Sequence, residues 1–243
     1  MWYQTLRVLL AWPVTRLWWP RVRGRRVVPA RGGAVLVSNH VSFSDSIFLP
    51  VELRRRVTFL AKREYFVRPG IIGAFSRWFF TAVGQVPIDR SGGRAAEAAI
   101  ATGIRVVRDG GLLGIYPEGT RSPDGRLYKG RTGAARIAIE AQVPVIPVAM
   151  INTFWVQPTG QVLPRLGRRI GISFGTPIDT SAWLGRASDP AAMRELTELM
   201  MAQLRELGGQ DYVDIYATKA KELIAQGVDP AVWAAGRTEE PTN

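Results

Sequence analysis

The sequence has no cysteine and only one histidine, His40, among its 243 residues. The absence of cysteine excludes disulfide bonds, thiolate catalysis and zinc sites built on cysteine. It is compatible with a reducing compartment but does not establish one. Because the chain offers one imidazole, His40 is the main candidate for a general base at neutral pH.

Lysine is also scarce, with 4 residues against 28 arginines, and the formal net charge is +12. The arginine guanidinium is planar and binds phosphate in a bidentate way. The basic excess therefore favours nucleic acid, an anionic membrane surface or a phosphorylated small molecule as a partner. Part of this basic excess can also be explained by a general preference of the genome for arginine, which has no functional meaning.

The first twenty residues lack the long apolar run of a transmembrane helix, because Arg7, Pro13 and Arg16 interrupt them. They also lack the basic start and the small-residue cleavage site of a secretory signal peptide. Their apolar residues recur at helical spacing, several are tryptophans, and an arginine-rich stretch follows. This pattern predicts an amphipathic helix on a membrane surface, with an ordinary core helix as the alternative.

Short apolar segments alternate with helical patterns along the rest of the chain. The expected strands cover residues 32–38, 57–61, 83–88, 112–116, 143–151 and 169–174. The expected helices cover residues 41–53, 93–108, 131–141 and 188–207. Alternation of this kind predicts an α/β fold, a mostly parallel sheet flanked by helices. We divide the chain into a membrane-association segment, residues 1–26, and one domain, residues 27–243.

Polar residues follow several of the expected strands. His40, Lys62, Arg90 and Glu118 each come just after an apolar segment. In parallel sheets, binding sites collect at the carboxyl ends of the strands. We therefore expect these side chains to converge, although they are far apart in the sequence.

His40 and Asp45 are separated by five positions, which constrains their geometry. In one continuous helix, five residues turn through about 500°, so the two side chains would lie about 140° apart. Contact requires His40 in the turn before a helix and Asp45 in its first turn, with Ser42 and Ser44 as candidate caps. Asp45 would then fix the imidazole tautomer and leave the other ring nitrogen to take a proton from a hydroxyl. A purely structural pair is the alternative.

Residues 116–122 follow another apolar strand and read Tyr-Pro-Glu-Gly-Thr-Arg-Ser. This block places a carboxylate on Glu118, a small residue at Gly119 and a guanidinium on Arg121. The guanidinium suits phosphate recognition, and glycine allows a substrate to approach the backbone closely. A turn with a solvated glutamate is the alternative interpretation.

Two other classes of function are disfavoured. Residues 171–175 fit the G-x-S-x-G pattern of a hydrolase nucleophile elbow around Ser173. That fold needs a histidine after the serine, and none follows, so a strand running into a glycine turn explains Ser173 better. The arginines are scattered and no nucleic-acid-binding module is visible, so we expect no nucleic acid partner.

Four blocks resemble, in order, motifs of the glycerophosphate acyltransferase superfamily, and most closely its 1-acylglycerol-3-phosphate O-acyltransferase (PlsC-like) branch. These blocks are residues 39–45, 86–90, 116–122 and 143–148. Tyr116 stands where the family motif has phenylalanine. The resemblance covers about residues 34–150.

The resemblance implies transfer of a fatty acyl group from acyl-CoA or acyl carrier protein to lysophosphatidic acid, which gives phosphatidic acid for phospholipid biosynthesis. It implies a lysophospholipid acceptor, an anionic membrane surface as partner, and a peripheral or monotopic location at the cytoplasmic face of the membrane. It implies no metal and no cofactor besides the acyl donor. Acylation of glycerol 3-phosphate, another lysophospholipid or a glycolipid is the alternative. A non-catalytic lipid-binding protein is the alternative of another class.

The resemblance also assigns roles to residues. His40 is the base that deprotonates the acceptor hydroxyl, Asp45 orients it, and Arg90 and Arg121 hold the acceptor phosphate. The other residues expected to contact substrate are Glu118 (at the glycerol portion), Gly119, Thr120 and Lys62. The Lys62 ammonium and the Gly119 N–H are the candidate donors to the oxyanion of the tetrahedral intermediate.

Overall fold

The fold is described from a computed structural model. The description covers residues 9, 11–62, 67, 69–70, 73–74, 77, 85–88, 95–161 and 163–238, and excludes the side chains of residues 61, 62, 87, 88, 237 and 238. Arg90 therefore lies outside the described residues.

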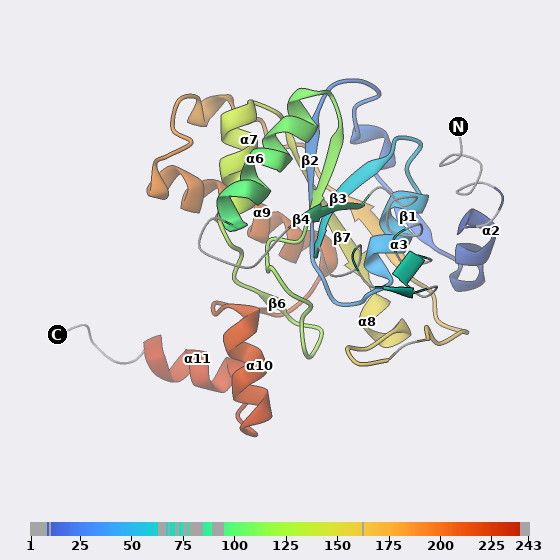
Figure 1. The fold of residues 1–243 in the computed structure, drawn as a ribbon. Coiled ribbons are helices and arrows are strands. Elements are labelled where there is room, and N and C mark those ends of the chain that lie inside the picture. The colour runs from blue at the N-terminus through green and yellow to red at the C-terminus, as the bar shows by residue number, and fades with distance from the viewer. Residues whose placement is uncertain are drawn as a thin grey trace.

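A seven-stranded sheet forms the centre of the domain (Figure 1), in the order β1-β8-β7-β2-β5-β3-β4. Its strands are β1 (Arg21–Arg23), β2 (Ala34–Ser38), β3 (Val57–Lys62), β4 (Gln85–Ile88), β5 (Leu112–Ile115), β7 (Val145–Ile151) and β8 (Gly171–Phe174). Only the β7–β8 pair among these strands is antiparallel. The prediction of a mostly parallel sheet is confirmed. A second, two-stranded parallel sheet joins β6 (Leu127–Tyr128) to β9 (Tyr212–Val213).

Helices cover both faces of the large sheet. The helices α6, α7 and α9 lie on one side, and α3 lies on the other together with α2 (Figure 1). The α-helices are α2 (Trp12–Thr15), α3 (Asp45–Val51), α6 (Ala95–Arg108), α7 (Gly133–Ala141), α8 (Thr153–Val156), α9 (Pro190–Gly208), α10 (Ala217–Ala225) and α11 (Pro230–Thr238). Short 3₁₀ turns are η2 (Arg16–Trp18), η3 (Arg25–Val27) and η4 (Ser181–Trp183).

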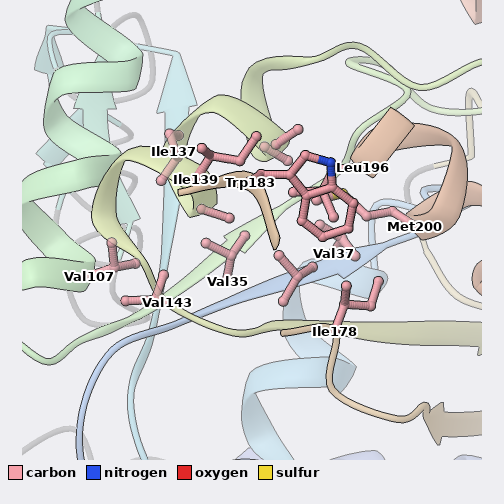
Figure 2. Close-up of a cluster of buried hydrophobic side chains, with 14 of the residues drawn as sticks. Val35, Val37, Val107, Ile137, Ile139, Val143, Ile178, Trp183, Leu196 and Met200 are labelled. Atoms are coloured by element: carbon pink, nitrogen blue, oxygen red, sulfur yellow. The ribbon is translucent and has the colours of Figure 1, made fainter. Parts of the chain in front are cut away.

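The alternation of side chains along β2 builds the two halves of the core. Val35 and Val37 face the cluster under α6, α7 and α9, whereas Ala34 and Leu36 face the cluster that includes Phe48 of α3. Figure 2 shows the first cluster, in which the Trp183 indole lies among aliphatic side chains. Burial of both faces explains why a central strand such as β2 is almost entirely apolar.

The ends of the helices follow the local chemistry. The helix expected over residues 188–207 is α9 (Pro190–Gly208), whose Asp189 cap accepts from the Ala191 N–H at 2.9 Å. Pro190 occupies the first turn, where its missing N–H costs no hydrogen bond. The helix expected over residues 41–53 is shorter, since α3 begins only at Asp45.

The N-terminal segment is described in part. The helix expected over the first twenty residues is represented by α2 and η2, and residues 1–8 and 10 of it lie outside the described residues. Trp18 is buried against Phe48, and β1 pairs with β8 at the edge of the sheet. The division of the chain at residue 26 stays a prediction. No helix in the part of the chain that the structure describes is long and apolar enough to cross a bilayer.

Ser173 lies within β8, opposite Ala149 of the antiparallel strand β7. A nucleophile elbow would place the serine in a sharp turn between a strand and a helix. The interpretation of Ser173 as a strand residue is therefore confirmed.

Candidate active site

The sheet brings the two polar blocks together. His40 follows β2 and residues 116–119 follow β5. The two strands are parallel neighbours, with Val37 opposite Ile115. Their carboxyl ends therefore meet at one edge of the sheet, as the sequence predicts.

Asn39 anchors the start of the histidine turn to the neighbouring strand. Its Oδ1 accepts from the Met150 N–H at 2.7 Å, and its Nδ2 donates to the Met150 carbonyl at 2.9 Å. The same Nδ2 also donates to Gln210 Oε1. Asn39 is fully buried. The side-chain amide of Asn39 thus makes the next two hydrogen bonds to the backbone of β7 in place of the β2 backbone. This fixes the point at which the chain leaves the sheet.

The imidazole of His40 contacts the carboxylate of Asp45. Their Nδ1 and Oδ2 atoms are 3.2 Å apart, and Asp45 is the first residue of α3. The sequence-based requirement of contact across a turn is confirmed. The same Oδ2 accepts from the N–H groups of Val41 at 2.9 Å and Ser42 at 2.8 Å. Asp45 therefore holds the whole turn as well as the ring.

The predicted serine caps of α3 do not form in the expected way. Ser44 occupies the N-cap position, but its side chain makes no capping hydrogen bond. Its N–H and hydroxyl instead engage Gln157 Oε1, and the Ser44 N–H also donates to Ser42 Oγ at 3.1 Å. The serines thus tie the turn to the segment after α8.

The second ring nitrogen of His40 is open. No hydrogen bond to Nε2 comes from any residue within the described ranges, and the side chain is 16% exposed. Because the Asp45 carboxylate only accepts, it favours the tautomer with the proton on Nδ1. Nε2 then carries a lone pair directed away from Asp45, which is what a general base requires.

The backbone and ring of His40 are held by the 116–122 block. The His40 N–H donates to Glu118 Oε1 at 2.9 Å, and its carbonyl accepts from the Ser122 N–H at 2.7 Å. The ring stacks on Tyr116 with centroids 3.8 Å apart and planes 12° apart. The Tyr116 hydroxyl lies 3.0 Å from Ser46 Oγ, next to Asp45. These contacts leave the imidazole little freedom to rotate.

Burial and the nearby negative charge of Asp45 raise the pKa of Tyr116 well above its ordinary value. The phenol therefore stays neutral and acts as a hydrogen-bonding support for the ring. A phenylalanine, which the family motif has here, would stack without the bond to Ser46.

Glu118 is held inside the site by two backbone N–H groups. It is fully buried, and its second oxygen accepts from the Tyr128 N–H at 3.1 Å. Burial raises the pKa of Glu118 to about 8, although the N–H groups of His40 and Tyr128 oppose this shift. With both oxygens engaged, Glu118 joins the His40 turn to β6. The predicted contact of Glu118 with the glycerol portion of a substrate stays a prediction.

Gly119 has a left-handed backbone conformation, and its predicted role as an oxyanion donor stays a prediction. Its φ is +76°, and its N–H donates to the Tyr116 carbonyl at 3.0 Å. The N–H is therefore engaged within the turn. A Cβ here would lie 2.9 Å from Arg131 Nε, which can move aside, so it is the positive φ that disfavours a side chain at this position.

The remaining predicted residues are described to different extents. Thr120 Oγ1 accepts from Lys221 Nζ at 2.6 Å. Arg121 is partly exposed and makes no ion pair with any residue of the described part of the chain. Lys62 ends β3, but its side chain, like all of Arg90, lies outside the described residues.

Several residues of the site were not predicted from the sequence. The backbone of Tyr128 and the side chains of Gln157 and Lys221 reach the site from segments without a recognisable motif. Asn39 lies in the motif block of residues 39–45, and its place directly before the histidine is the signal that could have identified it.

Comparisons with known proteins agree with this arrangement. The family model described as Acyltransferase matches residues 20–151. A chloroplastic 1-acyl-sn-glycerol-3-phosphate acyltransferase of Brassica napus is 37% identical over 52% of this chain and 35% of its own length. The human 1-acyl-sn-glycerol-3-phosphate acyltransferase beta is 39% identical over 51% of this chain and 43% of its own length. The chain thus spans well under two thirds of these two relatives.

Two further similarities extend over more of the chain. A 1-acyl-sn-glycerol-3-phosphate acyltransferase of Cocos nucifera is 27% identical over 98% of this chain and 76% of its own length. The crystal structure of the 1-acyl-sn-glycerophosphate (LPA) acyltransferase PlsC from Thermotoga maritima superposes with a TM-score of 0.62. It is 21% identical and covers 84% of this chain and 78% of that one. This structure shares the fold. Because the family model spans more than half of the residues and includes the whole histidine and glutamate blocks, the chain belongs to the acyltransferase family.

Proposed function

We propose that this protein transfers a fatty acyl group from acyl-CoA or acyl carrier protein to lysophosphatidic acid and forms phosphatidic acid. The observation that carries the proposal is the His40 imidazole, with Nδ1 against Asp45 and Nε2 open, on a backbone bonded to Glu118 and Ser122. A base fixed at one nitrogen and free at the other is suited to activate a hydroxyl.

The proposed reaction uses the acceptor hydroxyl as the nucleophile. Nε2 of His40 takes the hydroxyl proton while the oxygen attacks the thioester carbonyl carbon, and a tetrahedral intermediate forms. Asp45 stabilises the imidazolium produced in this step. The C–S bond then breaks, the carbonyl reforms as an ester, and the imidazolium returns its proton to the leaving thiolate. The products are the acylated acceptor and a free thiol.

Release of free CoA by the purified chain tests the proposal. With palmitoyl-CoA alone, we expect only slow thioester hydrolysis. Addition of lysophosphatidate should raise thiol release at least about tenfold, with phosphatidate as the matching product. Thiol release that does not respond to lysophosphatidate, but responds to another lysolipid or to glycerol 3-phosphate, would favour the alternative acceptors. No acceptor-dependent release at all would favour the lipid-binding alternative.

Arg121 is proposed to bind the acceptor phosphate. Arg121→Met removes a guanidinium that forms no ion pair with a carboxylate of the described residues. We therefore expect KM for lysophosphatidate to rise about tenfold to a hundredfold. KM for monoacylglycerol, which has no phosphate, should change little. Arg105→Met, at an exposed position on α6, removes the same charge and should leave both values unchanged. An equal loss with both acceptors in Arg121→Met would contradict the phosphate assignment.

The acceptor is a lipid, and an exposed apolar patch suggests how the protein reaches it. The patch comprises Trp12, Leu17, Trp19, Trp155, Leu163 and Leu166, all more than 40% exposed. It joins two segments, since Trp18 Nε1 donates to the Arg165 carbonyl at 2.7 Å. The arginines of β1 and η3 directly follow the first segment. We propose that this patch docks peripherally on an anionic membrane at its cytoplasmic face, where soluble acyl donors are available.

Two leucines of the patch, one from each segment, provide a test. Leu17→Ser with Leu166→Ser should weaken binding to phosphatidylcholine–phosphatidylglycerol vesicles by about 2 kcal/mol, or about thirtyfold. Leu184→Ser with Val232→Ser changes two residues outside the patch that are more exposed than Leu17 and Leu166, and this variant should bind like the unmodified protein. Equal vesicle binding by the two double variants would show that the patch does not dock on membranes.

A further inference from the structure

The C-terminal helix α10 brings a cation to the turn that carries Arg121. Lys221 Nζ donates to Thr120 Oγ1 at 2.6 Å, one residue before Arg121 in the chain. Lys221 lies 101 positions after Thr120 and outside the region that the family model matches. The family motifs therefore say nothing about it.

The position of Lys221 is fixed by packing. The strand β9, which precedes α10, pairs with β6, and Tyr128 of β6 packs with Val213, Ala217 and Ala220. The same Tyr128 supplies the backbone N–H that holds Glu118. Figure 1 shows α10 beyond the edge of the sheet, next to the β6 segment. The helix is thus anchored to an element of the active site, and the residue after Ala220 faces the Gly119–Arg121 turn.

Three cations surround this turn. Burial lowers the pKa of Lys221, the positive charge of Arg121 lowers it further, and Glu118 opposes this shift. The Arg131 guanidinium lies over the Tyr216 ring at 5.0 Å and next to Gly119. Within the described residues, no carboxylate forms an ion pair with Lys221, Arg121 or Arg131.

Like charges held close together raise the free energy of the folded state unless an anion lies between them. Among the described residues, the carboxyl group that interacts with Lys221 is that of Glu118, and its two oxygens already accept from backbone N–H groups. Gly119 at the centre of the turn is exposed, so a ligand from solvent can reach the cluster. The arrangement matches a phosphomonoester, which carries close to two negative charges and three acceptor oxygens.

We propose that Lys221 is a specificity-determining residue whose ammonium binds the acceptor phosphate together with Arg121. This inference rests on the proposed function for the identity of the acceptor. The bond to Thr120 places the ammonium, whose two other protons are available to phosphate oxygens. The C-terminal segment would thus complete a phosphate site that the four motif blocks of the sequence build only in part.

The kinetic test compares Lys221→Met, Lys221→Arg and Lys219→Met. Lys219 is on the same helix, but its Nζ pairs with Glu222 at 3.2 Å, so its variant controls for the lost charge. Lys221→Met should raise KM for lysophosphatidate about tenfold, change kcat little and leave KM for monoacylglycerol unchanged. Lys221→Arg should recover most of the loss, and Lys219→Met should behave like the unmodified protein. A fall in kcat with both acceptors alike would show that Lys221 only supports Thr120 and would overturn the proposal.

A binding test separates this inference from the proposed function. Inorganic phosphate should raise the Tm of the unmodified protein and of Lys219→Met, because a ligand that binds the native state stabilises it. The shift should be lost in Lys221→Met and retained in Lys221→Arg. This result would support the anion site even if lysophosphatidate were not acylated. An equal shift in Lys221→Met would overturn the site, whatever the catalytic activity of the protein.

Discussion

Replacing His40 with alanine is expected to lower acyl transfer to lysophosphatidate about a thousandfold or more. The described residues offer no second imidazole, since the sequence has only this one. Glu118 is close by, but both its oxygens are bound to backbone N–H groups. No other described side chain of the site can therefore act as the general base toward the acceptor hydroxyl. Initial rates of CoA release with lysophosphatidate measure the effect.

The loss must be assigned to chemistry rather than to folding or binding. His40→Ala leaves Arg121 and Lys221 in place, so phosphate should still raise the Tm of this variant. The backbone bonds of residue 40 to Glu118 and Ser122 do not depend on its side chain. Turnover within about tenfold of the unmodified protein, with the fold intact, would contradict the role of His40 as the base.

Replacing Asp45 with asparagine is expected to lower kcat by about a thousandfold to ten-thousandfold, with little change in KM. The asparagine carbonyl can still accept from Val41 and Ser42, which keeps the turn close to its present shape. It has no negative charge to stabilise the imidazolium. Its amide nitrogen would also take the place of Oδ1, a buried atom without a hydrogen-bond partner among the described residues. Steady-state kinetics with lysophosphatidate measure both constants.

Asp109→Asn provides the matched control for this substitution. Asp109 follows α6 at an exposed position, so the same chemical change there should leave kcat unaltered. If Asp45→Asn raised KM and left kcat intact, Asp45 would hold the turn without assisting the proton transfer. That result would mean that His40 acts as the base without needing the negative charge of Asp45.

The parts of the fold that follow from local periodicity could be predicted from the sequence. Each residue of a helix turns through about 100°, so the spacing of His40 and Asp45 required a turn before α3. The structure has this turn. The apolar strands alternating with helices likewise indicated a mostly parallel sheet, in which the ends of β2 and β5 meet.

The direction of polar side chains and the long-range contacts could not be predicted in this way. Nothing in the sequence around Glu118 shows that its carboxylate turns inward to the N–H of Tyr128, because that donor is on another strand. The contact of Lys221 with Thr120 depends on how α10 packs on β6. The engagement of the Gly119 N–H depends on the type of turn, which the residue types alone left open.

One competition experiment tests the central claim most directly. The purified protein is given palmitoyl-CoA and an equimolar mixture of lysophosphatidate, lysophosphatidylcholine, monoacylglycerol and glycerol 3-phosphate, and the products are identified by mass spectrometry. We predict phosphatidate as the main acylated product and its loss in His40→Ala. Preferential acylation of any other acceptor, or phosphatidate formed at an undiminished rate by His40→Ala, would contradict the account.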